Sequence, residues 1–130
     1  RDFHYLIRSS HYDLYELQAS MMQFCSKYFL PLQVQHQVQL LAEEVLQVVP
    51  LDKGEVDFAL KYSEKDGSIS IELLMPTIII SVWKNPKFAP DELSKAIIEG
   101  LCENIDEVVD DCPEGPRVRI RFKLKMKNEK

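Results

Sequence analysis

Two adjacent carboxylates, Glu43 and Glu44, could do acid or base chemistry. They stand in a stretch whose apolar residues recur at helical steps, so both are expected on one helix. Neighbouring side chains on a helix point about 100° apart, which prevents a close acid–base pair. A general base is one interpretation, and a solvated helix edge is the favoured one.

The three histidines, His4, His11 and His36, could each supply a base or a metal ligand. They are scattered along the chain and do not follow the spacing of a metal site. The run Ser9-Ser10-His11 suggests a nucleophile next to a base, but the glycine elbow of such sites is missing. We therefore predict ordinary surface or half-buried histidines, no metal site and no confident catalytic residue.

The three cysteines, Cys25, Cys102 and Cys112, are odd in number and contain no C-x-x-C pair. This pattern fits neither a disulfide framework nor a zinc site. It predicts free thiols in a reducing, cytoplasmic environment.

Charged residues gather in two runs near the C-terminal end. Between residues 117 and 127, Arg and Lys occupy every second position, which on a strand places them about 7 Å apart on one face. Residues 103–111 are rich in Asp and Glu and are expected to polarise the molecule against that basic row. The two interpretations are contacts with a charged partner and simple solvation.

Met21-Met22 and Trp83 are the side chains best suited to an exposed, adaptable interface. Core filling is the commoner role of both residue types, and it is the favoured interpretation.

The composition restricts the class of protein. The chain has 130 residues, of which 45% are hydrophobic and 28% charged, as in an ordinary globular domain. A net charge of −5 disfavours nucleic-acid binding, and no apolar run reaches the length of a membrane span. We expect one domain over residues 1–130, either a complete chain or, since it begins at Arg1, a fragment of a longer one.

Hydrophobic periodicity predicts the elements that must position these residues. Steps of three and four residues predict helices, and alternation or β-branched runs predict strands. Helices are expected over 13–30, 33–49 and 90–110, and strands over 3–8, 55–62, 69–75, 77–83 and 118–126. The predicted fold class is α+β, a two-layer α/β sandwich with a mixed or antiparallel sheet covered on one face by three helices.

This element order, together with Leu40-Leu41-Ala42-Glu43-Glu44-Val45-Leu46-Gln47 on the second helix, resembles the histidine-kinase-like ATPase fold and especially its anti-sigma-factor serine kinase branch. In that family the second helix carries an acid and, four residues later, an Asn that holds Mg²⁺ near the phosphates of ATP. The resemblance implies that Glu44 matches the acid. If ATP chemistry survives, Glu44 and Gln47 are the expected cofactor-binding residues.

Other family motifs are missing from the sequence. The Asn position holds Val48, which has no oxygen to offer a cation. The Asp-x-Gly motif that binds adenine should fall near residues 74–77, and the glycine-rich phosphate loop near 87–95, but neither stretch contains a glycine.

We therefore expect a degenerate, non-catalytic module that regulates or binds other proteins, without a cofactor, attached to or part of a larger transport or signalling ATPase. The alternative is a divergent ATP-binding serine kinase. A third hypothesis is an unrelated α+β sandwich in which Glu44 has no inherited role. In the anti-sigma branch the first strand can pair across a dimer, so a homodimer is a further expectation.

Overall fold

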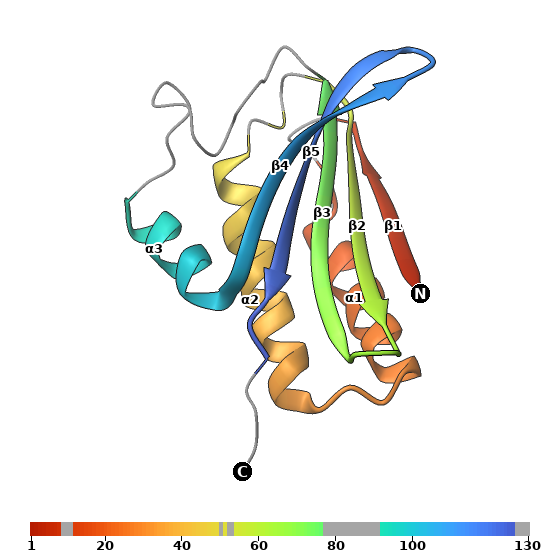
Figure 1. The fold of residues 1–130 in the computed structure, drawn as a ribbon. Coiled ribbons are helices and arrows are strands. Elements are labelled where there is room, and N and C mark those ends of the chain that lie inside the picture. The colour runs from red at the N-terminus through yellow and green to blue at the C-terminus, as the bar shows by residue number, and fades with distance from the viewer. Residues whose placement is uncertain (9–11, 50, 52–53, 77–91, 127–130) are drawn as a thin grey trace.

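The computed structural model describes residues 1–8, 12–49, 51, 54–76 and 92–126 of the chain. Its helices and strands form an α+β protein (Figure 1). In chain order they are β1 (Asp2–Ile7), α1 (Leu14–Lys27), α2 (Leu32–Val48), β2 (Val56–Ser63), β3 (Ser68–Pro76), α3 (Glu92–Leu101), β4 (Cys102–Cys112) and β5 (Gly115–Leu124).

The five strands form one sheet in the order β1-β2-β3-β5-β4, and every neighbouring pair is antiparallel. Figure 1 shows α1 and α2 behind this sheet, with α3 beside α2 at the β4 side. Contacts link α3 to α2 and to the start of β4. The predicted two-layer α/β sandwich is confirmed, with an antiparallel sheet.

The first helix, α1, follows the predicted period. Asp13 caps it by accepting a hydrogen bond from the Glu16 backbone N–H at 3.0 Å, and Leu17, Met21 and Cys25 are buried at four-residue steps. The helix ends in a Schellman motif, in which the Leu30 N–H donates to the Cys25 carbonyl. The left-handed position of this motif is usually glycine but holds Phe29, with φ of 58°.

The hairpin of β2 and β3 also agrees with the prediction. Val56, Phe58 and Leu60 of β2 are buried, as are Ile69, Ile71, Leu73 and Met75 of β3. Gly67 adopts φ of 71° in the turn, where a side chain would be strained, so the Lys65-Asp66-Gly67 signal marks the reversal correctly. The alternation places these apolar faces against α1 and α2.

The predicted helix over 90–110 is wrong beyond Leu101, because residues 102–112 form β4. Ile105 and Val108 fit a helical step, but Ile105 and Val109 equally fit one face of an alternating strand. The turn at Pro113 and Glu114 folds this segment back along β5, where pairing satisfies its backbone groups. Within α3, Ile98 is fully buried, whereas Leu93 is 68% exposed.

The core lies between the two layers. Its largest fully buried side chains include Phe58 and Phe122 from the sheet and Leu17, Met21 and Leu41 from the helices. The predicted strand over 77–83 lies outside the described residues.

Candidate functional site: the open face and edges of the sheet

The sheet face opposite the helices carries many charged side chains. Alternation along each strand sends these side chains away from the core. The side chains on this open face are Asp2, His4 and Leu6 of β1, Asp57, Ala59 and Lys61 of β2, Ser70, Glu72 and Leu74 of β3, Asn104, Asp106, Val108 and Asp110 of β4, and Arg117, Arg119, Arg121 and Lys123 of β5.

Glu72 is the centre of this face. Its side chain is only 7% exposed, yet its carboxylate binds two cations. The Arg121 Nε donates to it at 2.8 Å, and the Lys61 Nζ lies 3.4 Å from its other oxygen. A buried carboxylate needs such partners, since desolvation without them would be costly. Glu72 therefore ties β2, β3 and β5 together through charge.

The acidic and basic runs lie on adjacent strands, so the prediction that they polarise the molecule is wrong. Asp110 of β4 is ion-paired with Arg119 of β5, and Glu103 lies 3.9 Å from Lys123. The reason is the β4–β5 hairpin, which a helix over 102–110 would have prevented. Much of the basic row is neutralised by side chains of its own sheet.

Near the β1 side, His4 lies between two carboxylates. Its Nδ1 is 3.3 Å from Asp57 and its Nε2 is 3.8 Å from Asp2. A hollow of about 120 Å³ next to it is lined also by Lys61, Glu72 and Arg119. Among the described residues, no group of three His, Cys, Asp or Glu side chains is arranged to hold a metal ion.

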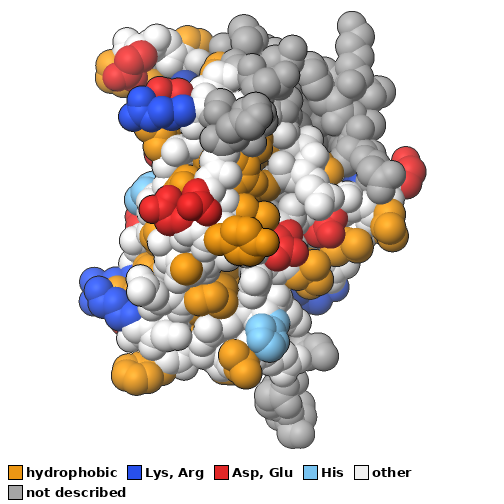
Figure 2. Space-filling view, turned by 180° about the vertical axis from the view of Figure 1, so that it is seen from behind, with side chains coloured by type: hydrophobic (Ala, Val, Ile, Leu, Met, Phe, Trp, Pro, Cys, Tyr) orange, Lys and Arg blue, Asp and Glu red, His pale blue; other side chains and the backbone are white. Residues whose placement is uncertain are grey.

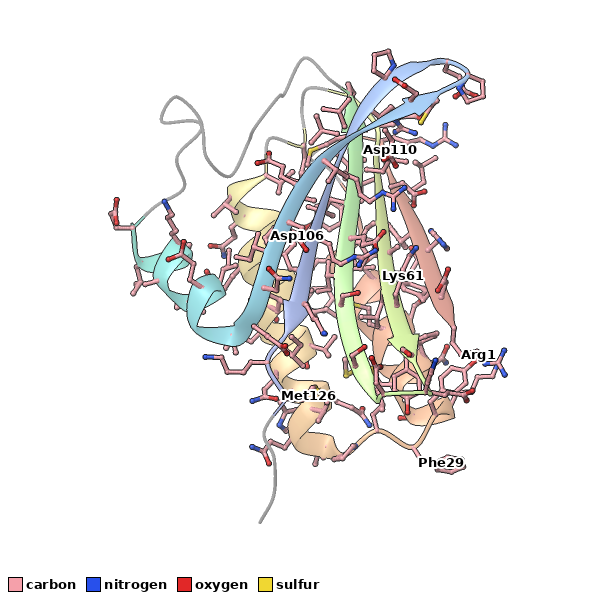
Figure 3. All side chains as sticks on the ribbon, in the orientation of Figure 1. Arg1, Phe29, Lys61, Asp106, Asp110 and Met126 are labelled. Carbon is pink, nitrogen blue, oxygen red and sulfur yellow. The ribbon has the colours of Figure 1, made fainter. Side chains whose placement is uncertain are left out.

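A second hollow, of about 300 Å³, lies along β4 and is lined by Asp106, Val108, Arg119 and Arg121 among others. It shares Arg119 with the smaller hollow, so the two adjoin across β5. In Figure 3, Asp106 and Asp110 follow one another along β4, and Lys61 lies across the sheet on β2.

The residues assigned to nucleotide binding lie on α2, on the opposite side of the molecule. Glu44 is half-buried, and Gln47, three residues later on the same helix, is exposed. Glu43 accepts a hydrogen bond from the Gln18 side chain, so it links α2 to α1. Val48 packs against the hydrophobic core. The structure thus places Glu44 and Gln47 on the same helix.

The helical side, seen in Figure 2, carries hydrophobic side chains as separate patches among polar and acidic ones. An apolar cleft of about 510 Å³ lies at the connection between α1 and α2, and its walls include Tyr28, Val34, Tyr62 and Met126. Phe29 borders this cleft with 90% of its surface exposed, and Figure 3 shows its ring pointing away from the molecule.

The remaining predicted side chains have structural roles where the structure describes them. Met21 is fully buried and Met22 packs partly against the core, as the favoured interpretation expected. His36 is exposed on α2. Ser9, Ser10, His11 and Trp83 lie outside the described residues.

All three cysteines are free thiols. Burial raises the pKa of Cys25 to about 11 and that of Cys102 to about 12, so both thiols stay protonated at neutral pH. A protonated thiol is a poor nucleophile, which argues against a reactive role for these two residues.

Sequence reasoning missed Glu72 and Lys61 as site residues. The available signal was the outward position of Glu72 in an otherwise apolar alternation, which placed a carboxylate on the same face as the basic row. Only the strand order, with β3 directly beside β5, pairs Glu72 with Arg121.

Among the described residues, no helix is long and apolar enough to cross a membrane. No protein-family model matches the chain, and no curated protein matches it in sequence. Its fold is similar to that of a chain in the crystal structure of the SiaB–SiaC complex from Pseudomonas aeruginosa. The TM-score is 0.62 at 11% sequence identity, and the alignment covers 94% of this chain and 89% of that chain. At this identity the likeness concerns the fold alone.

Proposed function

We propose that this chain is a regulatory, protein-binding module with a degenerate histidine-kinase-like fold that has lost ATP chemistry. It acts through contacts with a protein partner or with a parent-chain domain, in a transport or signalling ATPase assembly. The similar fold found in a complex of two proteins supports a role in protein contacts. Its net charge of −5 and its free thiols favour a cytoplasmic protein partner over nucleic acid.

The main support for this proposal is that Val48 occupies the position where the family has an Asn. In the family that the sequence resembles, the corresponding Asn helps to hold Mg²⁺, whereas this valine packs against the hydrophobic core. Mg²⁺ binds through oxygen ligands, so Glu44 would be the one family ligand left on α2. In addition, no glycine stands between Gly67 and Gly100, so the sequence lacks the backbone freedom with which phosphate loops approach a nucleotide.

The direct test is isothermal titration of Mg-ATP and Mg-ADP into the purified protein. We expect no binding with a Kd below about 1 mM. The variants Glu44→Ala and Glu43→Ala form a matched pair, since the two carboxylates are adjacent on α2 but only Glu43 is held by Gln18. Binding that Glu44→Ala abolishes and Glu43→Ala keeps would replace this proposal with a divergent ATP-binding serine kinase.

A homodimer through β1 is the second part of the proposal. Arg1 and Tyr62 exchange both backbone hydrogen bonds, at 2.9 and 2.8 Å. Because bonded and non-bonded pairs alternate in antiparallel sheets, the backbone groups of Asp2, His4 and Leu6 point away from β2. Such an edge can accept a strand from a second copy.

Light scattering after size exclusion tests this dimer. We expect a mass near twice the 15.1 kDa of one chain. His4→Pro removes an outward N–H without touching the β1–β2 bonds and should give a monomer, whereas His4→Ala keeps the N–H and should remain dimeric. A monomeric unmodified protein would exclude the dimer but leave the protein-binding proposal intact.

A further inference from the structure

The strand β4 ends the described sheet on the side opposite to β1. Its backbone directions follow from the hairpin that joins it to β5. Cys112 and Gly115 flank a two-residue turn and form the closing pair, so hydrogen-bonded pairs recur at every second position along β4. The backbone groups of Asp106, Val108 and Asp110 therefore face β5, and those of Ile105, Val109 and Asp111 face outward.

Proline positions agree with this assignment. Pro116 stands opposite Asp111, and Pro76 of β3 stands opposite Arg117. Since proline has no N–H, neither pair can exchange two hydrogen bonds, and both fall at non-bonded positions of the alternation.

The outer edge of β4 lacks three features that commonly prevent strand pairing at sheet edges, namely Lys, Pro and a bulge in its regular part. Its charged side chains are all acidic, so they disfavour pairing with a like-charged strand but not with a cationic one. In β4 the irregularity lies between Cys102 and Asn104, and the register from Ile105 to Cys112 is regular. Lys and Pro are missing from its sequence, and Val108 and Val109 are 50% and 59% exposed. The described edge is thus open to a further strand.

The charge of β4 indicates which strand would fit. Among its eleven residues are Glu103, Asp106, Glu107, Asp110 and Asp111, with no Lys or Arg. The strand that β4 already accepts on its inner side, β5, has the complementary pattern, with Arg and Lys at every second position and apolar residues between them. Asp106 stands opposite Arg121, and Asp110 opposite Arg117.

We propose that the outer edge of β4 binds an extended segment of a partner protein in which Lys or Arg alternates with apolar residues. The segment adds a strand to the sheet through the outward backbone groups of Ile105, Val109 and Asp111. Its cations lie on the open face, beside Asp106 and Asp110, and its apolar residues lie on the other face, beside Val109. Figure 3 shows Asp106 and Asp110 in line along this edge. This inference names the partner class of the proposed protein-binding function and rests on it.

A peptide with the sequence of residues 117–124, Arg-Val-Arg-Ile-Arg-Phe-Lys-Leu, is a suitable probe because it copies the strand that β4 accepts. Labelled with fluorescein, it is expected to bind the intact protein in a fluorescence anisotropy titration at low salt. The affinity should fall at least about tenfold at roughly 1 M salt, because exposed charges are screened there. A control peptide with Glu at every Arg and Lys position should not bind.

Two variants locate the binding. Val109→Pro removes an outward N–H that β5 does not use, and it should weaken peptide binding by at least about tenfold. Val109→Lys keeps the N–H but places a cation at the edge, and it should weaken binding similarly even if the proline variant fails to fold. Phe29→Ala, at the end of α1, should leave the affinity unchanged.

Several results would overturn the inference. These are no binding of the peptide, equal binding of the acidic control, or equal affinity in the Val109 variants; the last would indicate that the peptide merely exchanges with β5. Such results leave the nucleotide titration unaffected, whereas Mg-ATP binding dependent on Glu44 would refute the proposed function itself.

Discussion

Replacing Phe122 by alanine is expected to lower the free energy of unfolding by about 3–5 kcal/mol. Phe122 is fully buried in β5, between Ile71 of β3 and Ile105 of β4 in the register. Truncation removes a large apolar surface and leaves a cavity that the surrounding strands can fill only in part. Urea denaturation followed by circular dichroism measures the loss.

Phe29→Ala is the matched control, because it makes the same chemical change on a side chain that is 90% exposed. Alanine keeps the Cβ, so the strain of the left-handed backbone at this position is largely unchanged. A change within about 0.5 kcal/mol is expected. Equal losses in the two variants would mean that the sheet does not bury β5 as described.

Glu72→Ala is expected to lower the free energy of unfolding by about 1–3 kcal/mol. The substitution leaves Lys61 and Arg121 without their shared carboxylate. Their side chains are 36% and 48% exposed, so both can recover part of their hydration, which keeps the loss below that of a fully buried ion pair. Thermal and urea unfolding of the variant measure the effect.

Glu55→Ala provides the comparison for Glu72. Glu55 lies 3.7 Å from Arg8, and their side chains are 56% and 75% exposed. Such a surface pair contributes little, so the variant should change stability by less than about 0.5 kcal/mol. If Glu72→Ala were equally silent, the ion pairs at the centre of the open face would have no structural importance.

The ion pairs of the open face also bear on function. A partner that docked flat on this face would have to separate Glu72 from Arg121 or Asp110 from Arg119, and it would have to replace those contacts. A partner strand at an edge leaves these pairs in place and gains backbone hydrogen bonds. For this reason we propose the edges of the sheet, and not its open face, as the place of protein binding.

Local pattern was enough to predict most of the elements. In these elements only one periodicity buries the apolar residues, so the pattern allows only one type of secondary structure. Examples are the helical steps of Leu17, Met21 and Cys25 and the alternation in β2, β3 and β5. Asp13 and Gly67 mark their cap and turn through side-chain and backbone chemistry that needs no tertiary context. The sequence alone therefore determined the α+β class and its two layers.

The secondary structure of residues 102–112 was decided by the tertiary structure. Its apolar residues fit both a helical and an alternating repeat, and pairing with β5 selects the strand because the hairpin satisfies backbone groups and opposes Asp110 to Arg117. The same non-local order places β3 beside β5 and buries Glu72 between Lys61 and Arg121. Periodicity reports only which face of an element is apolar. Strand order determines which charges meet across strands and which backbone edges remain open. Strand order is a property of the folded chain.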